Sequence, residues 1–233
     1  VSDNSQYKLY DRPDDQPIGD GTGVDTLKDQ SGNENYAYAS GSNQPTYNDN
    51  SLNNRAIVTF DGTDDIMNID NSEDINESTS AQTQRSFVVS FRTGGNVSDR
   101  QVIYEEGGGT RGLNIYVEND SLYFGGWNLA EDNWGYTYVT GHVQANTEYA
   151  AILEMNAKDT IFRGWLNGSL MGTETDVAPL YAHGGEIRFG GNESAVYWDG
   201  SSSSPHYFAG DIMQFMNYNY TINTAQQNII ENY

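Results

Sequence analysis

Two adjacent acidic residues, Glu105 and Glu106, precede three glycines and Arg111 in the stretch YEEGGGTRG (104–112). Glycoside hydrolysis needs two carboxyl groups facing one cleft, ~5–5.5 Å apart for retention or ~6.5–9.5 Å apart for inversion. Neighbouring residues of a strand point to opposite faces, so these two carboxylates cannot converge if both lie on one strand. The pattern therefore favours a strand and a turn, in which residues 107–109 supply positive φ, over a catalytic pair.

Other catalytic patterns are absent from the sequence. The three histidines, His142, His183 and His206, are far apart and lack the spacing of metal ligands. The chain has no cysteine, which excludes thiol chemistry, zinc–thiolate sites and disulfides. Neither a Gly-x-Ser-x-Gly motif nor a phosphate-binding loop occurs. These absences favour a binding protein over an enzyme.

Aromatic residues supply candidate sugar contacts, because pyranose rings present flat C–H faces that stack on aromatic rings. Trp127 and Trp134 flank the polar stretch NLAEDN, and Trp198 lies in the long polar segment 192–208. We expect Trp127 and Trp198 to be exposed and Trp165, which lies inside a strand, to pack against the protein. Trp134, Tyr136 and Tyr138 alternate along one strand and form either part of the core or a binding platform.

Arginines gather in one part of this acidic chain. Four of the 11 basic residues lie within residues 85–111, namely Arg85, Arg92, Arg100 and Arg111. In the strands SFVVSFRT and LNIYVEN, alternation directs Arg92, Asn114 and Tyr116 away from the core, where they could line a concave sheet face. Each arginine either pairs with a nearby carboxylate or helps to recognise a carboxylated or sulfated sugar, whose oxyanions fit the guanidinium fork.

A calcium site is predicted in the acidic stretch DGTDDIMNIDNSEDINE (61–77), which contains seven carboxylates. Calcium takes six to eight oxygen ligands, and loops of Asp, Asn and backbone carbonyls supply them. The candidate ligands are Asp61, Asp64 and Asp65, together with Asp211, which needs a partner at the start of an apolar strand. The EF-hand pattern is absent, and a solvated acidic loop is the alternative.

Composition limits the partners. The chain has 233 residues and a formal net charge of −22, which repels a phosphate backbone and makes nucleic acid an unsuitable ligand. No apolar run approaches the ~20 residues of a membrane span. The start, VSDNSQYKLYDRPDD, does not read as a signal peptide. We expect a processed terminus or an excised domain of a secreted bacterial protein, for which the absence of disulfides is ordinary.

The pattern along the chain predicts one all-β domain over residues 1–233. The first 55 residues are polar and rich in turn formers, and later segments are short, β-branched or aromatic and bounded by Gly, Asn or Asp. The stretches NDS (119–121) and NGS (167–169) predict tight hairpins, and a short helix is expected over 223–233, capped by Thr221 or Asn223. We predict a two-sheet antiparallel β-sandwich. Its strands are expected at 55–62, 86–93, 101–106, 113–119, 121–127, 135–141, 148–155, 160–168, 185–191 and 210–220.

Several phrases resemble laminin G-like domains of the concanavalin A-like lectin/glucanase superfamily. They are LKDQSGNENYAY (27–38), QPTYND (44–49), RAIVTFDGTDDIM (55–67), residues 100–128, YAHGGEIRFGG (181–191) and residues 207–233. The resemblance implies a jelly-roll sandwich, often with structural calcium, that hosts lectins, adhesion modules and glycanases alike. Glycanases of this fold usually carry Glu-x-Asp-x-Glu on one strand, and that motif and the lyase motifs are absent here.

The function predicted from the sequence is therefore non-catalytic. We expect a carbohydrate-binding or adhesion module of a secreted or surface bacterial protein, and one module of a larger chain. Its partner would be a polysaccharide or glycan, including an anionic one, with no nucleic acid and no membrane insertion. The alternatives are a glycan-degrading enzyme of the same fold and a structural spacer of an adhesin.

Overall fold

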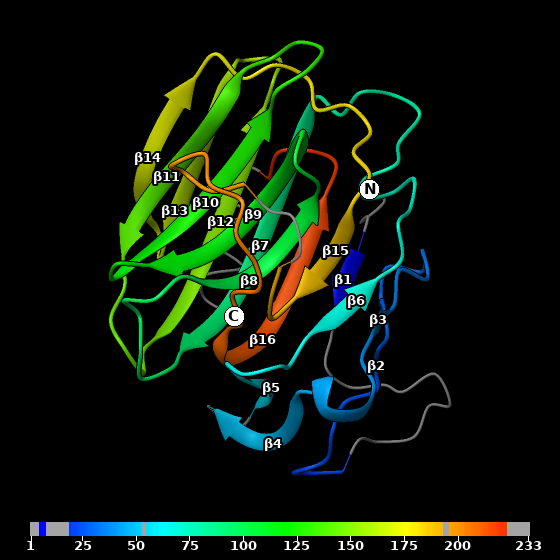
Figure 1. Cartoon of the computed structure of the whole chain (residues 1–233), viewed down its shortest axis with the longest axis vertical. Helices are drawn as coiled ribbons and strands as arrows, with labels where there is room; N and C mark the ends of the chain where they lie inside the picture. The colour runs from blue at the N-terminus through cyan, green and yellow to red at the C-terminus, as the bar shows by residue number, and fades with distance from the viewer. Residues whose placement is uncertain (1–4, 8–18, 53–54, 193–195, 223–233) are drawn as a thin grey trace.

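The computed structural model describes residues 5–7, 19–52, 55–192 and 196–222, and they form two antiparallel sheets packed face to face (Figure 1). This confirms the predicted all-β sandwich. Apart from the strands, the described chain contains one short 3-10 turn, Gly41–Asn43. The helix predicted over 223–233 lies outside the described residues. No helix in the described part of the chain is long and apolar enough to span a membrane.

Each sheet has eight strands. The first sheet has the order β14 (Ser169–Thr175), β13 (Ile161–Leu166), β12 (Glu148–Asn156), β7 (Gln84–Thr93), β16 (Ala209–Tyr218), β5 (Arg55–Asp61) and β4 (Thr46–Leu52), and β1 (Ser5–Tyr7) pairs with β16. The second sheet has the order β11 (Gly135–His142), β10 (Ser121–Asn128), β9 (Arg111–Glu118), β8 (Gln101–Gly107), β15 (Glu186–Phe189), β6 (Met67–Ile69), β3 (Ala37–Tyr38) and β2 (Thr26–Leu27).

The ten predicted strands correspond to β5, β7–β13, β15 and β16, with small shifts at their ends. The predicted hairpins are also confirmed. Asn119 and Asp120 have positive φ between β9 and β10, and Asn167 and Gly168 have positive φ between β13 and β14. Two central residues with φ > 0 match the twist of the flanking strands, which explains the preference for Asn, Asp and Gly.

The core lies between the sheets and follows the period-2 alternation of the sequence. The side chains of Phe87, Val89 and Phe91 on β7 are fully buried in it. From the opposite sheet, alternate residues of β9, such as Leu113 and Ile115, join the same cluster. Successive residues point to opposite faces, so the intervening residues of β9 lie on the outer face of the second sheet.

A long segment covers part of that outer face. Residues 196–208, named here the covering segment and coloured orange in Figure 1, run across the second sheet. Val196 and Tyr197 pack with Val102, Tyr116 and Trp127 in a second apolar cluster. The Asn114 amide donates a hydrogen bond to the Val196 carbonyl at 3.0 Å. Where this segment covers it, the second sheet is therefore buried on both faces: one face packs on the core and the other packs on the segment.

Candidate functional site

Glu105 and Glu106 lie on opposite faces of β8. Glu105 is the register partner of Asn114, on the outer face, and Glu106 is the partner of Leu113, on the core face. Both glutamates are fully buried. This confirms that the two carboxylates do not converge on one cleft. Gly107 has a φ of 116°, so this glycine supplies the positive φ that the predicted turn requires.

Glu106 forms an ion pair inside the core. Its carboxylate lies 2.8 Å from the Arg85 guanidinium of the facing sheet and accepts a hydrogen bond from the Tyr104 hydroxyl at 2.8 Å. Burial opposes ionisation, but Arg85, His183 and Tyr104 together hold the pKa of Glu106 below its usual value. Glu106 is thus an ionised structural group that links the sheets.

Trp127 is not an exposed platform, and that prediction is wrong. Its side chain is fully buried beneath the covering segment, and its indole N–H donates to the Gly108 carbonyl at 2.8 Å. Trp134 is half-buried and packs on the main core beside Phe162. Trp165 is also half-buried and packs against an apolar cluster of the first sheet, as expected.

Three exposed rings lie together near β11 on the outer face of the second sheet, and we name them the aromatic surface: Tyr136, Tyr138 and Trp198. Their exposed fractions are 45%, 38% and 41%. Among the described residues, Tyr38 is also an exposed ring of this sheet, but it lies on β3, toward the opposite edge. The Trp198 ring is 6.1 Å from Tyr138, centroid to centroid, in an edge-to-face arrangement. Gly200 of the same turn as Trp198 lies against the Tyr136 ring. The three alternating residues Trp134, Tyr136 and Tyr138 therefore do not share one environment: Trp134 packs on the core, and the two tyrosines face solvent.

Trp198 is fixed in place by two hydrogen bonds to β9. Its backbone N–H donates to the Tyr116 hydroxyl at 3.2 Å, and its indole N–H donates to the Glu118 carboxylate at 3.1 Å. Tyr116 is stacked on Tyr123 at 4.7 Å, and Tyr123 in turn lies 6.1 Å from Tyr138. The exposed rings thus rest on a layer of buried and half-buried tyrosines, which restricts their motion before any ligand arrives.

Arg100 organises the turn that carries Trp198. Its guanidinium stacks 3.9 Å from the centroid of Tyr197, donates to Ser201 at 2.8 Å, and pairs with Glu118 at 3.0 Å and Asp199 at 3.4 Å. Burial opposes the charge, but these two carboxylates raise the pKa of Arg100. The sequence left open whether Arg100 pairs with a nearby carboxylate or recognises an anionic sugar, and the structure shows the carboxylate pairing. The stacking partner of Arg100 is about a hundred residues away in the chain, so no local signal could reveal it.

A polar depression of about 450 Å³ lies beside the end of β11. It is open to solvent and lined by Asn96, Ser98, Asp120, His142 and Gln144, among others. By alternation His142 lies on the same face of β11 as Tyr136 and Tyr138. The outer face of β11 therefore leads from the aromatic rings to amide, hydroxyl and imidazole groups that can bind sugar hydroxyls.

The prediction that Arg92, Asn114 and Tyr116 line one open face is wrong. Arg92 is on β7 of the first sheet, whereas Asn114 and Tyr116 are on β9 of the second and are fully buried under the covering segment. Arg111 begins β9 in register with Asn128 and Gly135, so its backbone is near Tyr136, but by alternation its side chain lies on the other face of the sheet from the rings. It donates to Asn128 at 3.0 Å, and its guanidinium lies 5.3 Å from the Tyr181 ring.

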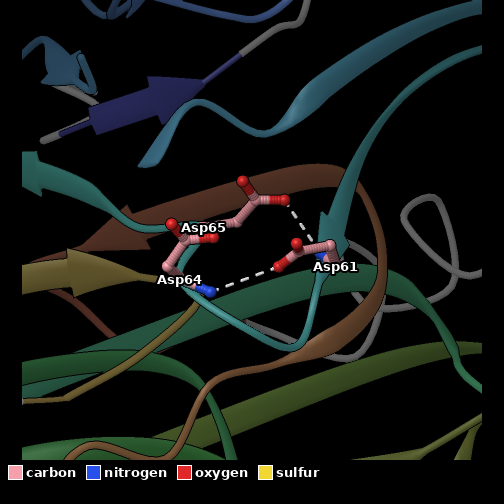
Figure 2. A group of neighbouring side chains, drawn as sticks. All are labelled: Asp61, Asp64 and Asp65. Atoms are coloured by element: carbon pink, nitrogen blue, oxygen red, sulfur yellow. Dashed lines mark hydrogen bonds between the residues drawn. The ribbon is translucent and has the colours of Figure 1, made fainter. Parts of the chain in front are cut away.

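Asp61, Asp64 and Asp65 come together in one turn, as Figure 2 shows, each offering an oxygen within 4.8 Å of the others. The Asp65 carboxylate accepts the Asp61 N–H at 2.8 Å, and the Asp61 carboxylate accepts the N–H groups of Thr63 and Asp64. Because Asp65 is buried, its pKa rises to about 6. The three oxygens can serve a hard cation such as calcium.

Asp211 does not belong to this group. It accepts a hydrogen bond from the Thr59 hydroxyl at 2.6 Å and pairs with the Arg92 guanidinium at 2.6 Å. A guanidinium therefore supplies the partner that its buried carboxylate requires, and the prediction of Asp211 as a metal ligand is wrong.

No known protein-family model matches the chain, and no curated protein matches it. The laminin G-like resemblance therefore remains a prediction. Solved structures do match. The receptor-binding domain of botulinum neurotoxin D is 13% identical with a TM-score of 0.68, over 99% of this chain and 52% of that chain.

Two further matches carry ligands in their descriptions. One is the ligand-binding domain of botulinum neurotoxin D in complex with N-acetylneuraminic acid, 13% identical with a TM-score of 0.65, over 99% of this chain and 50% of that chain. The other is a structure of botulinum neurotoxin type C, described by the dependence of that toxin's cell entry on interaction with two ganglioside molecules. It is 15% identical with a TM-score of 0.62, over 98% of this chain and 51% of that chain. The chain spans about half the length of these proteins and shares the β-sandwich fold of the half that it matches.

Proposed function

We propose that this chain is a non-catalytic carbohydrate-binding module that holds a glycan against the aromatic surface of Tyr136, Tyr138 and Trp198. The observation that carries the proposal is the gathering of three exposed rings on one face, fixed from below by Tyr116, Tyr123 and Glu118. Soluble proteins bury most large aromatic side chains, so a contiguous exposed group marks an interaction site.

The chemistry of the surface suits a sugar. A ring that covers a pyranose face hides about 60–80 Å² of apolar area, which stabilises the complex by on the order of 1.5–2 kcal/mol. The Ser201 hydroxyl and Asp199 carboxylate of the same turn, and the groups of the polar depression, can bind sugar hydroxyls. Aromatic stacking supplies affinity, and the polar groups select the orientation.

The comparisons support a binding role, since the matched structures are receptor-binding and ligand-binding domains. A secreted or surface-exposed location, a role in adhesion and membership of a larger protein are parts of the same proposal. They rest on the acidic composition and the laminin G-like resemblance.

Replacement of Trp198 by Ala tests the proposal. Because the ring is exposed, we expect binding on a glycan array to weaken by roughly ten- to thirtyfold, while the melting temperature stays nearly constant. Leu170→Ala is the matched control, because Leu170 is 56% exposed on β14 of the other sheet. Trp127→Ala should instead destabilise the protein by about 3–5 kcal/mol. Unchanged binding of the Trp198 variant to a confirmed glycan would contradict the site.

The two alternatives have distinct outcomes in solution. Incubation with laminarin, alginate, agar and carrageenan should release no reducing ends and no unsaturated products. Turnover in this assay would favour the glycan-degrading enzyme over a binding module. If the protein retains no glycan on the array and turns none over, the spacer function is favoured.

We also propose that calcium binds at Asp61, Asp64 and Asp65, supported by the convergence of their oxygens. A ligand that binds only the native state stabilises it by about 2.7 kcal/mol at a hundredfold excess over Kd. Millimolar calcium should therefore raise the melting temperature of the wild type above its value in chelator. Asp65→Asn keeps the acceptor for the Asp61 N–H but removes a charged ligand, so it should lose this response. An equal rise with magnesium, or in the variant, would indicate general screening of the net charge instead.

A further inference from the structure

Building on the proposed function, we infer that the glycan held by the aromatic surface is uncharged, and that Glu118 and Asp199 make the site reject anionic sugars. The sequence alone left an anionic ligand open because of its cluster of arginines. The structure separates those arginines and places the carboxylates of Glu118 and Asp199 at Trp198 and its turn.

The charged groups that touch Trp198 or its turn are Glu118, Asp199 and Arg100. Two carboxylates and one guanidinium leave a net charge of −1. The exposed fractions of the side chains are 15% for Glu118, 38% for Asp199 and 10% for Arg100. The carboxylates, and Asp199 above all, are thus more accessible to an incoming ligand than the guanidinium, so a sugar acid would meet like charge there.

Arg100 cannot serve an anionic ligand while its partners are in place. Its guanidinium already donates to Ser201, Glu118 and Asp199, and its face is stacked on Tyr197. Hydrogen bonds from Ser201 hold the pKa of Asp199 below its usual value, so that carboxylate stays ionised at neutral pH. A sugar carboxylate would have to displace these contacts before it gained any from Arg100.

The other arginines of residues 85–111 are out of reach. Arg85 lies between the sheets and Arg92 is paired on the first sheet. Arg111 begins β9, roughly 24 Å along the strand from Glu118 at a rise of about 3.4 Å per residue. Its backbone is in register with Asn128 and Gly135, near Tyr136, but alternation places its side chain on the face of Leu113, opposite to Tyr136, and its guanidinium lies 5.3 Å from the Tyr181 ring. The polar depression beyond Tyr138 adds the carboxylate of Asp120. The surface therefore offers planar rings and hydroxyl-binding groups with an excess of negative charge.

Glu118 has two roles in this arrangement, because it accepts the indole N–H of Trp198 and also pairs with Arg100. Glu118→Gln can keep the first contact through its amide oxygen while removing the charge. Combined with Asp199→Asn, it leaves the guanidinium of Arg100 without a carboxylate partner. The fork of an unpaired arginine matches a carboxylate or sulfate, so this double variant should gain affinity for anionic sugars.

The test uses a glycan array on which each neutral oligosaccharide stands beside its sialylated, sulfated and uronate-bearing counterparts. We expect the wild type to bind the neutral member of a pair at least tenfold more tightly, with little change between 50 and 500 mM NaCl. The ratio of affinity for the neutral member to affinity for the anionic member should fall at least threefold in the Glu118→Gln/Asp199→Asn variant, because this variant binds the anionic member better. Glu174→Gln/Asp176→Asn, which makes the same charge change at an exposed residue of β14 and at the exposed residue just after it, should leave this ratio unchanged.

The outcomes separate this inference from the proposed function. If the wild type prefers anionic members and Trp198→Ala abolishes that binding, the function stands and the uncharged ligand is wrong. If neutral glycans are preferred but the double variant keeps the wild-type ratio, the assignment to Glu118 and Asp199 is wrong. If no glycan binds, or Trp198→Ala has no effect, the proposed function itself fails.

Discussion

His206 is a residue on which the covering segment depends. Its backbone N–H donates to the Asn192 side chain at 2.9 Å, and its carbonyl accepts the N–H of Val102 on β8 at 3.0 Å. The imidazole lies 2.9 Å from the Ser203 hydroxyl and meets the Tyr197 ring edge-on. Burial and the nearby Arg100 lower the pKa of His206, although Glu118 acts in the opposite direction.

Acid should therefore loosen this segment. Because the folded state lowers the His206 pKa, the unfolded chain binds more protons once the pH falls below the ordinary value of about 6.5. The contribution of His206 to stability is complete above that pH and is lost as the pH falls toward the folded pKa. Melting temperatures at pH 7.5, 6.5 and 5.5 should decline more steeply for the wild type than for His206→Gln. Parallel declines would assign the acid sensitivity to other groups.

The exposure of single side chains could be predicted from the sequence only in part. The exposure of Trp198 was predicted correctly from its place in a long polar segment. Trp127 has equally polar neighbours in sequence, yet it is buried because Val196 and Tyr197 pack over it. Alternation correctly placed Asn114 and Tyr116 on the outer face, but it contains no information about what covers that face. Long-range packing determined which of these side chains could reach a ligand.

At the scale of elements, the hairpin between β8 and β9 depends on one glycine. Gly107 has a φ of 116°, and a Cβ there would collide with the Arg111 carbonyl across the hairpin. Gly109, in the same turn, has open space where a Cβ would stand and no positive φ. Three adjacent glycines of identical chemistry thus differ in how much the fold requires them.

Alanine substitutions should separate the two glycines. Gly107→Ala combines an unfavourable φ with a backbone clash, so a destabilisation of order 1–3 kcal/mol is expected. Gly109→Ala should leave stability unchanged or raise it slightly, since it restricts the unfolded chain without strain. Urea unfolding measures both. Equal effects of the two substitutions would contradict the role given to the Gly107 conformation.

Most of the strands from residue 55 onward could be predicted because their side chains alternate and their ends carry turn residues. The strands before residue 53 and β6 were missed. β2, β3 and β6 contain only two or three residues each, and β4, although seven residues long, has the mostly polar sequence TYNDNSL. β14 was missed for a different reason. Its residues are mostly exposed on an edge of the first sheet, so its sequence, SLMGTET, lacks the buried positions that produce a period of two.

At the scale of the whole molecule, a buried polar network joins the two sheets through an apolar core. Arg85 on β7 pairs with Glu106 on β8 of the facing sheet, and both side chains have no exposed area. Arg85 also donates to the Ile75 carbonyl at 2.6 Å and to Asn217 on β16 at 2.9 Å. An ion pair in such a place contributes little net stability but is harmful when broken, because one charge is left without a partner.

Loss of one member should therefore be worse than loss of both charges. Arg85→Met leaves the Glu106 carboxylate buried without its cation, which should lower the free energy of unfolding by about 3–5 kcal/mol. Adding Glu106→Gln removes the uncompensated charge and keeps an acceptor for the Tyr104 hydroxyl, so the double variant should be more stable than Arg85→Met alone. Arg85→Lys retains the positive charge but loses the guanidinium geometry, so its free energy of unfolding should lie between those of the wild type and Arg85→Met. Urea unfolding of the wild type, Arg85→Met, Glu106→Gln and the double variant gives the coupling energy. A double variant as unstable as the sum of its single changes would show that the two sheets are held together without this pair.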